Sequence, residues 1–292
     1  MAQALGAYFL WGLLPLYLLL VRHVPAVEFV GWRVLFTVPI CLVIVIVRRQ
    51  APKVLAALAN PRVLGLLVLS AVLIGANWLI YILAVQAGHV FAASLGYYIN
   101  PLVNVVAGTL FLGERMSRWQ WLAVAIAAAG VSLLAWEARD MLGIALSLAG
   151  TFAAYGLVRK VAPVGSLPGL TIETLVLTAP AVLLLAWLSG EPAGLHLGMG
   201  LAADLATAAS GLVTAAPLLL FAVAARRMDY STLGFVQFLA PTLVFLIGLL
   251  VFHEPLRPVQ LVCFVLIWTA AALFIWDLVA QSRRLATVRP PA

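Results

Sequence analysis

The chain has 292 residues, of which 65% are hydrophobic and 9% are charged, and its mean hydropathy is +1.14. Soluble domains carry about 25% charged residues, so this composition excludes a soluble globular protein and indicates an integral membrane protein. The formal net charge of +7 comes from Lys and Arg residues scattered over several segments. A nucleic-acid-binding protein would gather them on one face, so no nucleic-acid partner is predicted.

Long apolar runs, bounded by charges or by Pro and Gly, predict the elements that cross the lipid bilayer. A bilayer core about 30 Å thick needs ~20 apolar residues per helix, whereas a membrane β-barrel is built from short alternating segments. The sequence therefore predicts an all-α membrane protein with ten transmembrane helices. The expected spans are 4–22, 27–47, 63–87, 91–112, 118–136, 141–158, 169–188, 203–225, 230–252 and 258–279.

The basic residues between these spans predict the orientation of the chain. With the amino terminus in the cytoplasm, 13 of the 17 Lys and Arg residues fall on the cytoplasmic side. Only Arg22, Arg139 and Arg257 fall on the outer side, and Arg33 lies inside the second span. This asymmetry follows the positive-inside rule, so we expect both termini to be cytoplasmic.

An internal repeat relates the two halves of the chain. When the sequence is shifted by 140 positions along itself, several Pro, Glu, Gln and Trp residues align. Chance matches in a Leu/Ala/Val-rich chain do not explain residues of these types. The matched pairs include Pro101 and Pro241, Glu114 and Glu254, Gln120 and Gln260, and Trp136 and Trp276. Because each half has an odd number of spans, the halves enter the membrane from opposite sides, as in many transporters. We predict two inverted five-helix repeats around a central cavity, 1–138 and 139–280, with a cytoplasmic tail at 281–292.

A polar stripe marks the fourth span. Tyr97, Asn100, Pro101 and Asn104 recur at helical spacings of three and four, and an amide that faces hydrocarbon costs several kcal/mol unless it is paired. These groups should therefore face the bundle interior or a wet cavity. With polar and aromatic residues near mid-span in other helices they form the predicted substrate-binding set. That set is Trp11, Asn77, Tyr81, Tyr97, Asn100, Asn104, Tyr155 and Gln237.

Two interpretations of this set are open at this point. Polar and aromatic residues in membrane bundles also serve as helix-packing contacts and interfacial belts. In a cavity, aromatic walls would suit amphipathic guests and cations, and amides could orient a carboxylate and an amine.

For the charged residues inside the spans, structural or gating roles are favoured, and substrate contact is the alternative. Glu28 and Arg33 are five residues apart, about 140° around a helix, so each needs a partner on another helix. Glu173 lies near the cytoplasmic end of the seventh span, and His196 is expected in a solvated loop.

The two cysteines and the mid-helix prolines complete the predictions from single residues. Cys41 and Cys263 lie inside apolar runs, so they are expected to be small core residues, and no metal or cofactor is predicted. Pro101 and Pro241 each remove a backbone donor from a span, and we expect gating or structural roles for them as points where these helices flex.

The segments SAVLIGANWLIYILAV, ASLGYYINPLVNVVAGTLFLGER, YGLVRK and STLGFVQFLAPTLVFL resemble the RarD-type branch of the EamA group of the drug/metabolite transporter superfamily, and the YddG-type amino-acid exporters are near relatives. The resemblance covers nearly the whole chain. It implies a multi-pass protein of the bacterial inner membrane that exports aromatic or neutral amino acids and related small metabolites by alternating access. Export of toxic compounds or drugs by the same fold is the alternative. The resemblance does not name a substrate.

Other functional classes are less well supported by the sequence. A membrane enzyme would need a chemical motif, and the chain has no HExxH, GxSxG or GxxxxGK[ST]. A channel would need a ring of groups from symmetric subunits, which one chain with two repeats does not supply. The expected partners are a small-molecule substrate and the lipid bilayer, and we expect a monomer to be functional.

Overall fold

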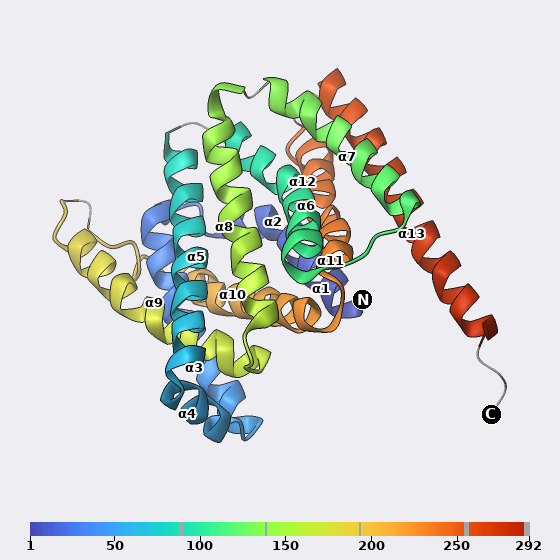
Figure 1. Ribbon diagram of the computed structural model, residues 1–292. Coiled ribbons are helices and arrows are strands. Elements are labelled where there is room, and N and C mark those ends of the chain that lie inside the picture. The colour runs from blue at the N-terminus through green and yellow to red at the C-terminus, as the bar shows by residue number, and fades with distance from the viewer. Residues whose placement is uncertain (88–89, 138, 193, 254–256, 289–292) are drawn as a thin grey trace.

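The computed structural model describes residues 1–87, 90–137, 139–192, 194–253 and 257–288, and in these ranges all regular structure is helical (Figure 1). The helices are α1 (Ala2–Gly12), α2 (Leu14–Leu20), α3 (Ala26–Val47), α4 (Ala51–Ala59), α5 (Pro61–Gln86), α6 (Val90–Leu112), α7 (Arg118–Glu137), the 3-10 turn η1 (Arg139–Met141), α8 (Leu142–Val161), α9 (Ser166–Ser189), α10 (Leu201–Arg227), α11 (Tyr230–Gln237), α12 (Leu239–Leu250) and α13 (Pro258–Val288).

The predicted all-α, multi-span architecture is confirmed. Within the described ranges, 9 helices are long and apolar enough to cross a membrane, and α1 with α2, bent by 41°, brings the number to 10. Each predicted apolar segment coincides with one helix or with two consecutive helices, and their ends differ by a few residues. The exception is α13, which continues to Val288 instead of ending near residue 279. The short helix α4 between α3 and α5 was not predicted.

Two spans break close to a proline, but the span that contains Pro101 does not. The first span breaks at Leu13, just before Pro15 in the first turn of α2. The ninth span breaks at Phe238, three residues before Pro241. Helix α6 continues through Pro101. Proline removes a backbone hydrogen bond and crowds the preceding turn, and in a membrane bundle the neighbouring helices decide whether a break follows.

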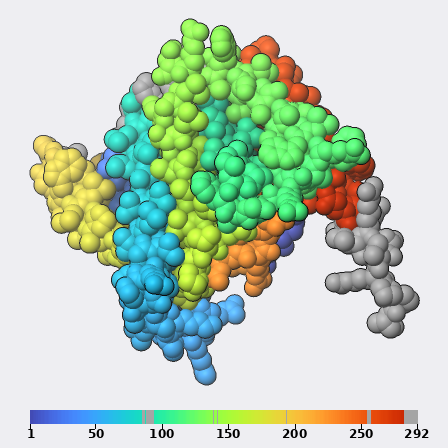
Figure 2. Space-filling model, in the orientation of Figure 1, coloured from blue at the N-terminus to red at the C-terminus, as the bar shows by residue number. Residues whose placement is uncertain are grey.

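The long helices pack in pairs that join the two halves of the chain. Helix α7 lies along α13 on one side of the bundle, and α5 and α8 run side by side along another face (Figures 1 and 2). Helix α6 packs against α8 and α11, α3 packs against α9 and α10, and α1 packs against α10 and α12. The main helix contacts therefore run between the two halves rather than within one of them. A binding site is expected in the space that the halves enclose.

The surface and interior have the polarity expected of a protein in lipid. Large apolar side chains such as Ile46, Leu110 and Trp136 are 70% or more exposed. Polar side chains such as Ser70 and Asn104 are fully buried. Lipid solvates the first group without cost, whereas the second group needs partners inside the bundle.

Glu114, in the Gly-Glu-Arg sequence after α6, joins the two halves of the chain at one end of the bundle. Gly113 adopts a positive φ of 65°, which turns the chain so that Glu114 reaches the first turn of α11. The Glu114 carboxylate accepts hydrogen bonds from Tyr230 N at 2.6 Å and Ser231 N at 2.8 Å, and Lys160 Nζ lies 3.7 Å away. The first amides of a helix lack partners within the helix and carry partial positive charge, so this carboxylate caps α11 from a distant part of the sequence.

Candidate functional site

A central cavity of about 710 Å³ lies between the two halves. Its wall comes mainly from α1, α2, α3, α5, α6, α12 and α13. It runs from mid-bundle, where Tyr8 and Gln237 line it, to the end of the bundle where Arg22 and Arg257 lie. We call this end, which includes residues 21–25, the open end. The other end carries α4, Glu114 and the start of α11, and we call it the closed end.

An aromatic cluster separates the cavity from the closed end. Phe221 lies at its centre, with ring centroids 5.7 Å from Trp11, 5.3 Å from Phe152 and 6.0 Å from Tyr155. Phe221 and Tyr155 are fully buried, whereas Trp11 and Phe152 line the cavity. Aromatic rings at these distances pack with favourable edge and offset geometry, so the cluster forms a dry floor.

A buried amide network supports one side of this floor. Gln237 Oε1 accepts hydrogen bonds from Asn104 Nδ2 at 2.8 Å and from Tyr8 Oη at 3.3 Å. Gln237 sits in the last turn of α11, directly before the break at Phe238, and the break leaves its side chain at the cavity wall. Because Oε1 accepts both bonds, the Nε2 group is the donor that Gln237 offers to a guest.

The opposite wall combines an amide with two phenols. Asn77 Nδ2 donates to Leu148 O at 2.8 Å and to Thr151 Oγ1 at 2.9 Å, which fixes the side chain and leaves its Oδ1 as an acceptor. The rings of Tyr81 and Tyr97 pack with centroids 6.0 Å apart, and Tyr97 is 42% exposed. All three residues line the cavity, which therefore has a polar acceptor beside an aromatic wall.

The two charges of α3 have separate partners. Glu28 is 2% exposed and accepts hydrogen bonds from Trp32 Nε1 and from the backbone N of His196, with His196 Nδ1 2.8 Å from its second oxygen. Arg33 lines the cavity, donates from Nε to Thr214 Oγ1 at 3.1 Å, and lies 4.5 Å from the ring centroid of Trp78. The expectation of a partner on another helix is confirmed for Arg33, whereas Glu28 is bound by Trp32 of its own helix and by His196 of a loop. His196 lies in a loop as expected, but it is only 24% exposed because its ring contacts Glu28 on α3.

The structure divides the predicted binding set. The members that line the cavity are Trp11, Asn77, Tyr81, Tyr97 and Gln237. Asn104 and Tyr155 are fully buried and Asn100 is 2% exposed, and these three are not among the lining residues. Pro241 lies in the cavity wall, whereas Pro101 and Glu28 do not. The Asn100–Asn104 face of α6 packs toward α11, where Gly234 lies so close that a Cβ would be 2.7 Å from Pro101 O.

Other lining residues were outside the predicted set. They include Tyr8, Arg33, Trp78, Tyr98 and Phe152. The sequence carried a signal for two of them. Tyr8 precedes Trp11 by three residues and so shares its helix face, and Arg33 is a charge inside an apolar span, which by default marks a functional site in membrane proteins.

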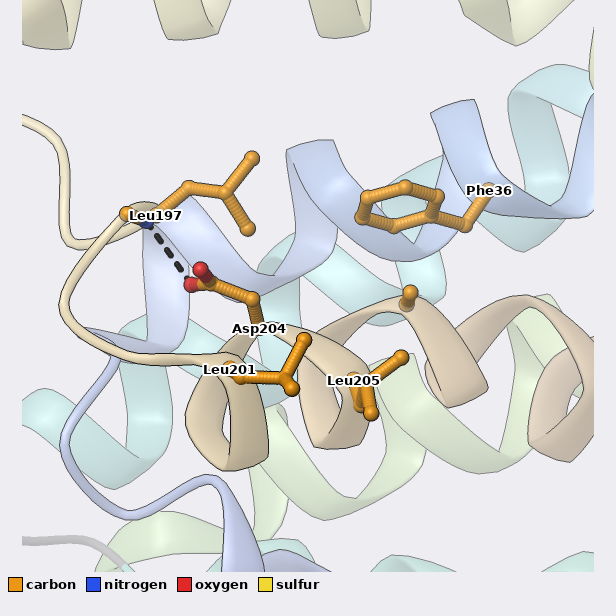
Figure 3. A pocket seen from close by; sticks show the side chains of 7 residues that line it. Phe36, Leu197, Leu201, Asp204 and Leu205 are labelled. Atoms are coloured by element: carbon orange, nitrogen blue, oxygen red, sulfur yellow. Dashed lines mark hydrogen bonds between the residues drawn. The ribbon is translucent and has the colours of Figure 1, made fainter.

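A second, shallower pocket of about 420 Å³ lies between α3 and the start of α10 (Figure 3). Its side chains are mostly apolar, and the carboxylate of Asp204 already accepts a hydrogen bond from Gly198 N at 2.8 Å. Leu201 and Leu205 are 76% and 60% exposed, as expected for residues that face lipid. The central cavity, with its free donors and acceptors, is therefore the candidate site.

A multi-span helical bundle that encloses a polar and aromatic cavity, open toward one end and closed by packed side chains at the other, has the architecture of a membrane transporter. The sequence profile of the EamA-like transporter family matches residues 1–136. The chain is 43% identical over 282 residues to RarD of Salmonella typhimurium, and this match covers 96% of each of the two chains. It is 42% identical over 281 residues to an uncharacterized transporter of Pseudomonas aeruginosa, covering 96% of this chain and 94% of that one.

These similarities show that the chain belongs to the EamA-like transporter family, so it is a membrane transporter and not an enzyme. Its fold is also similar to that of a solved crystal structure with 21% sequence identity. That similarity has a TM-score of 0.73 and covers 94% of this chain and 96% of the other.

Proposed function

We propose that this protein is a bacterial inner-membrane transporter that exports aromatic or neutral amino acids and related small metabolites by alternating access. The central cavity carries this proposal. Ligand sites in proteins are typically concave spaces of about 300 to 1,000 Å³ with apolar and aromatic walls and a few placed polar groups. A cavity of about 710 Å³ with Trp11, Tyr81 and Tyr97 in its wall and with amides at Asn77 and Gln237 fits that description.

The packing of the helices supports the inverted repeat, with 1–138 and 139–280 as its units. Exchanging each span with the one five positions later maps the main contacts onto one another. The pairs α7–α13, α3–α9 and α6–α11 map onto themselves. The contact of α6 with α8 maps onto that of α12 with α1, α5 with α8 onto α10 with α1, and α3 with α10 onto α9 with α5. Such reciprocity is what a two-fold axis between the halves produces, and an odd number of spans per half would put that axis in the membrane plane.

Cytoplasmic termini complete the proposal, on the strength of the 13 basic residues that share their side. The open end of the cavity then faces the periplasm, and the aromatic floor around Phe221 blocks the way to the cytoplasm. Export requires a second state in which this floor opens and the wall near Arg22 and Arg257 closes. The breaks at Leu13 and Phe238 lie beside the cavity, and we propose that bending there, with Pro241 and Pro101 in gating roles, exchanges the two states.

Export of toxic compounds or drugs is the second candidate, and the aromatic lining favours it as well. Flat amphipathic molecules of many kinds stack on tryptophan and tyrosine rings. The two candidates share the cavity and the cycle, so only the chemistry of the accepted cargo separates them.

Counterflow in proteoliposomes tests the proposed function. Vesicles that contain the purified protein and a high internal concentration of unlabelled phenylalanine should transiently accumulate external radiolabelled phenylalanine. A carrier exchanges one cargo for another, whereas a channel lets the label equilibrate without an overshoot. Chloramphenicol, as a competing drug-like compound, gives the alternative its own arm. The absence of an overshoot with phenylalanine and with a panel of neutral amino acids would refute the proposed cargo.

Cysteine labelling tests whether the predicted residues share one accessible space. We expect Tyr97→Cys and Gln237→Cys to react with a small charged thiol reagent added from the periplasmic side, with faster reaction at position 97, because Tyr97 is 42% exposed and Gln237 4%. Val105→Cys, on the same helix but fully buried, is the matched control. The wild-type cysteines, Cys41 and Cys263, are also fully buried and provide the background. Equal inertness of all three variants from both sides would contradict the cavity assignment.

A further inference from the structure

The cavity contains a guanidinium group that no described acidic side chain neutralises. Arg33, the eighth residue of α3, projects into the cavity wall, where its side chain contacts the hydroxyl of Thr214 and the ring of Trp78, both uncharged. We propose that Arg33 binds the carboxylate of the cargo, so that the preferred substrates are carboxylate-bearing amphipathic molecules. This inference rests on the proposed function and names the chemical class that the same cavity selects.

The nearest acid in the sequence is already engaged elsewhere. Glu28 lies one and a half turns before Arg33, points to another side of α3, and holds Trp32 Nε1 and the backbone and ring nitrogens of His196. Each carboxylate oxygen of Glu28 thus has a hydrogen-bond partner at 2.8 Å, and neither Trp32 nor His196 lines the cavity. Among the described residues that line the cavity none is acidic, while Arg22 and Arg33 are basic. The electrostatic field inside the cavity therefore favours an anionic group.

The donors of Arg33 are arranged for a carboxylate. A guanidinium has five N–H groups in a fixed plane, and only the Nε–H is used, in the bond of 3.1 Å to Thr214. The four N–H groups on Nη1 and Nη2 have no hydrogen-bond partner among the residues that the structure describes. Two parallel N–H donors match the two oxygens of a carboxylate, and such bidentate pairs are stronger and more directional than bonds between neutral groups. Thr214 and Trp78 hold the plane from two sides, which fixes the direction of approach.

The groups around Arg33 complete a site for an amino acid with an apolar or aromatic side chain. Tyr81 and Tyr97 provide the aromatic wall, and the free Oδ1 of Asn77 is an acceptor for an ammonium group. A cation that lacks a carboxylate would meet Arg33 with nothing to neutralise it. Repulsion of this kind gives specificity against competitors as effectively as attraction gives it for the preferred cargo. The cavity should therefore discriminate against purely cationic drugs.

Four probes that differ only in their charged groups test the inference. They are phenylalanine, its amide, 3-phenylpropionate and phenethylamine, and binding to the purified full-length protein is followed by tryptophan fluorescence, since Trp11 and Trp78 line the cavity. For the wild-type protein we expect the two carboxylates to bind at least about tenfold more tightly than the two compounds without one. The Arg33→Gln variant should bind the two carboxylates about 10- to 100-fold more weakly and the other two unchanged.

Two further variants separate recognition from structure. Arg33→Lys keeps the charge but not the two-pronged geometry, so its affinity for the carboxylates should be intermediate. Arg62→Gln removes one positive charge from the exposed start of α5 and should leave all four affinities unchanged. A purely structural role of Arg33 would lower all four affinities together, and that result would overturn the inference. If Arg33→Gln does not fold, the wild-type series decides, because equal affinity for phenylalanine and its amide refutes carboxylate recognition.

The inference and the proposed function fail in different ways. If the protein binds the carboxylates selectively but shows no counterflow, the proposed transport of these compounds is refuted and carboxylate binding by Arg33 still stands. Counterflow of phenylalanine by Arg33→Gln at the wild-type rate and affinity would keep the proposed function and overturn the inference. Failure of the wild-type protein to bind any of the four probes would overturn both.

Discussion

Replacing Glu173 by alanine is expected to destabilise the folded protein by about 3 to 5 kcal/mol, because the substitution leaves a buried charge without its partner. Glu173 and Arg159 are each 1% exposed, and Arg159 Nε lies 3.4 Å from Glu173 Oε1. Ser70 Oγ also donates a hydrogen bond to the carboxylate, and Arg159 Nη2 donates to Ser166 O at 3.0 Å. The network ties α5, α8 and α9 together near the closed end of the bundle.

Chemical unfolding in detergent micelles, followed by circular dichroism, measures this effect. Glu191→Ala is the matched control, because this carboxylate is exposed two residues after the end of the same helix and has no ion pair among the described residues. The double replacement Arg159→Met with Glu173→Leu should be much more stable than Glu173→Ala, since removing both charges leaves no unpaired ion. A Glu173→Ala protein that unfolds at the wild-type midpoint would show that the pair contributes nothing to holding these helices.

The network also shows where sequence analysis of this chain reached its limit. Glu173 was recognisable as an acid inside an apolar span, and such a residue needs a partner within the bundle. Its partner, Arg159, looked like one of many basic residues at a cytoplasmic helix end. The pairing depends on the sharp 162–165 connection and on Gly169, where a side chain would overlap the guanidinium of Arg159. These are properties of the packed structure, and periodicity in one helix does not contain them.

The spans themselves were predictable because lipid imposes one strong rule. Backbone groups in the bilayer core need hydrogen-bond partners, which a helix supplies within itself, so about 20 apolar residues between charges or Pro/Gly punctuation mark an element with little reference to its neighbours. Side-chain direction is less constrained. The stripe on α6 was correctly periodic, yet Tyr97 lines the cavity while Asn104 bonds Gln237 on α11. These two residues are seven apart, so they share one side of the helix but lie about 10 Å apart along it, where the neighbours differ.

The sequence predicted that Glu28 and Arg33 on α3 need different partners, but it did not predict which residues these partners are. The 140° between Glu28 and Arg33 required two different neighbours. His196 reaches Glu28 from a loop 168 positions away, and Thr214 reaches Arg33 from a helix 181 positions away. No local pattern in the sequence connects residues at such separations. The cavity-facing position of Arg33 therefore emerged only when the helices were assembled.

Replacing Gly211 by alanine is expected to destabilise the protein by about 2 to 3 kcal/mol, because a methyl group there would overlap the backbone carbonyl of Phe36 on α3. A carbonyl group of a helix cannot rotate away as the end of a side chain can, so α3 and α10 would have to separate. Thr37 Oγ1, which lies 3.4 Å from Gly211 O, marks the same close crossing. Small residues at such crossings are what allow membrane helices to approach closely.

Gly150→Ala is the matched control, since this glycine lies inside α8 and a Cβ there would meet no atom within 4 Å. Alanine should be neutral or stabilising by up to about 1 kcal/mol at that position, because it favours the helix. Separation of α3 from α10 should also stretch the bond from Arg33 to Thr214, which lies one turn after Gly211. Gly211→Ala should therefore weaken phenylalanine binding in the protein that remains folded, whereas Gly150→Ala should not. Equal unfolding midpoints and equal affinities for the two variants would mean that the helices do not cross as closely as the structure places them.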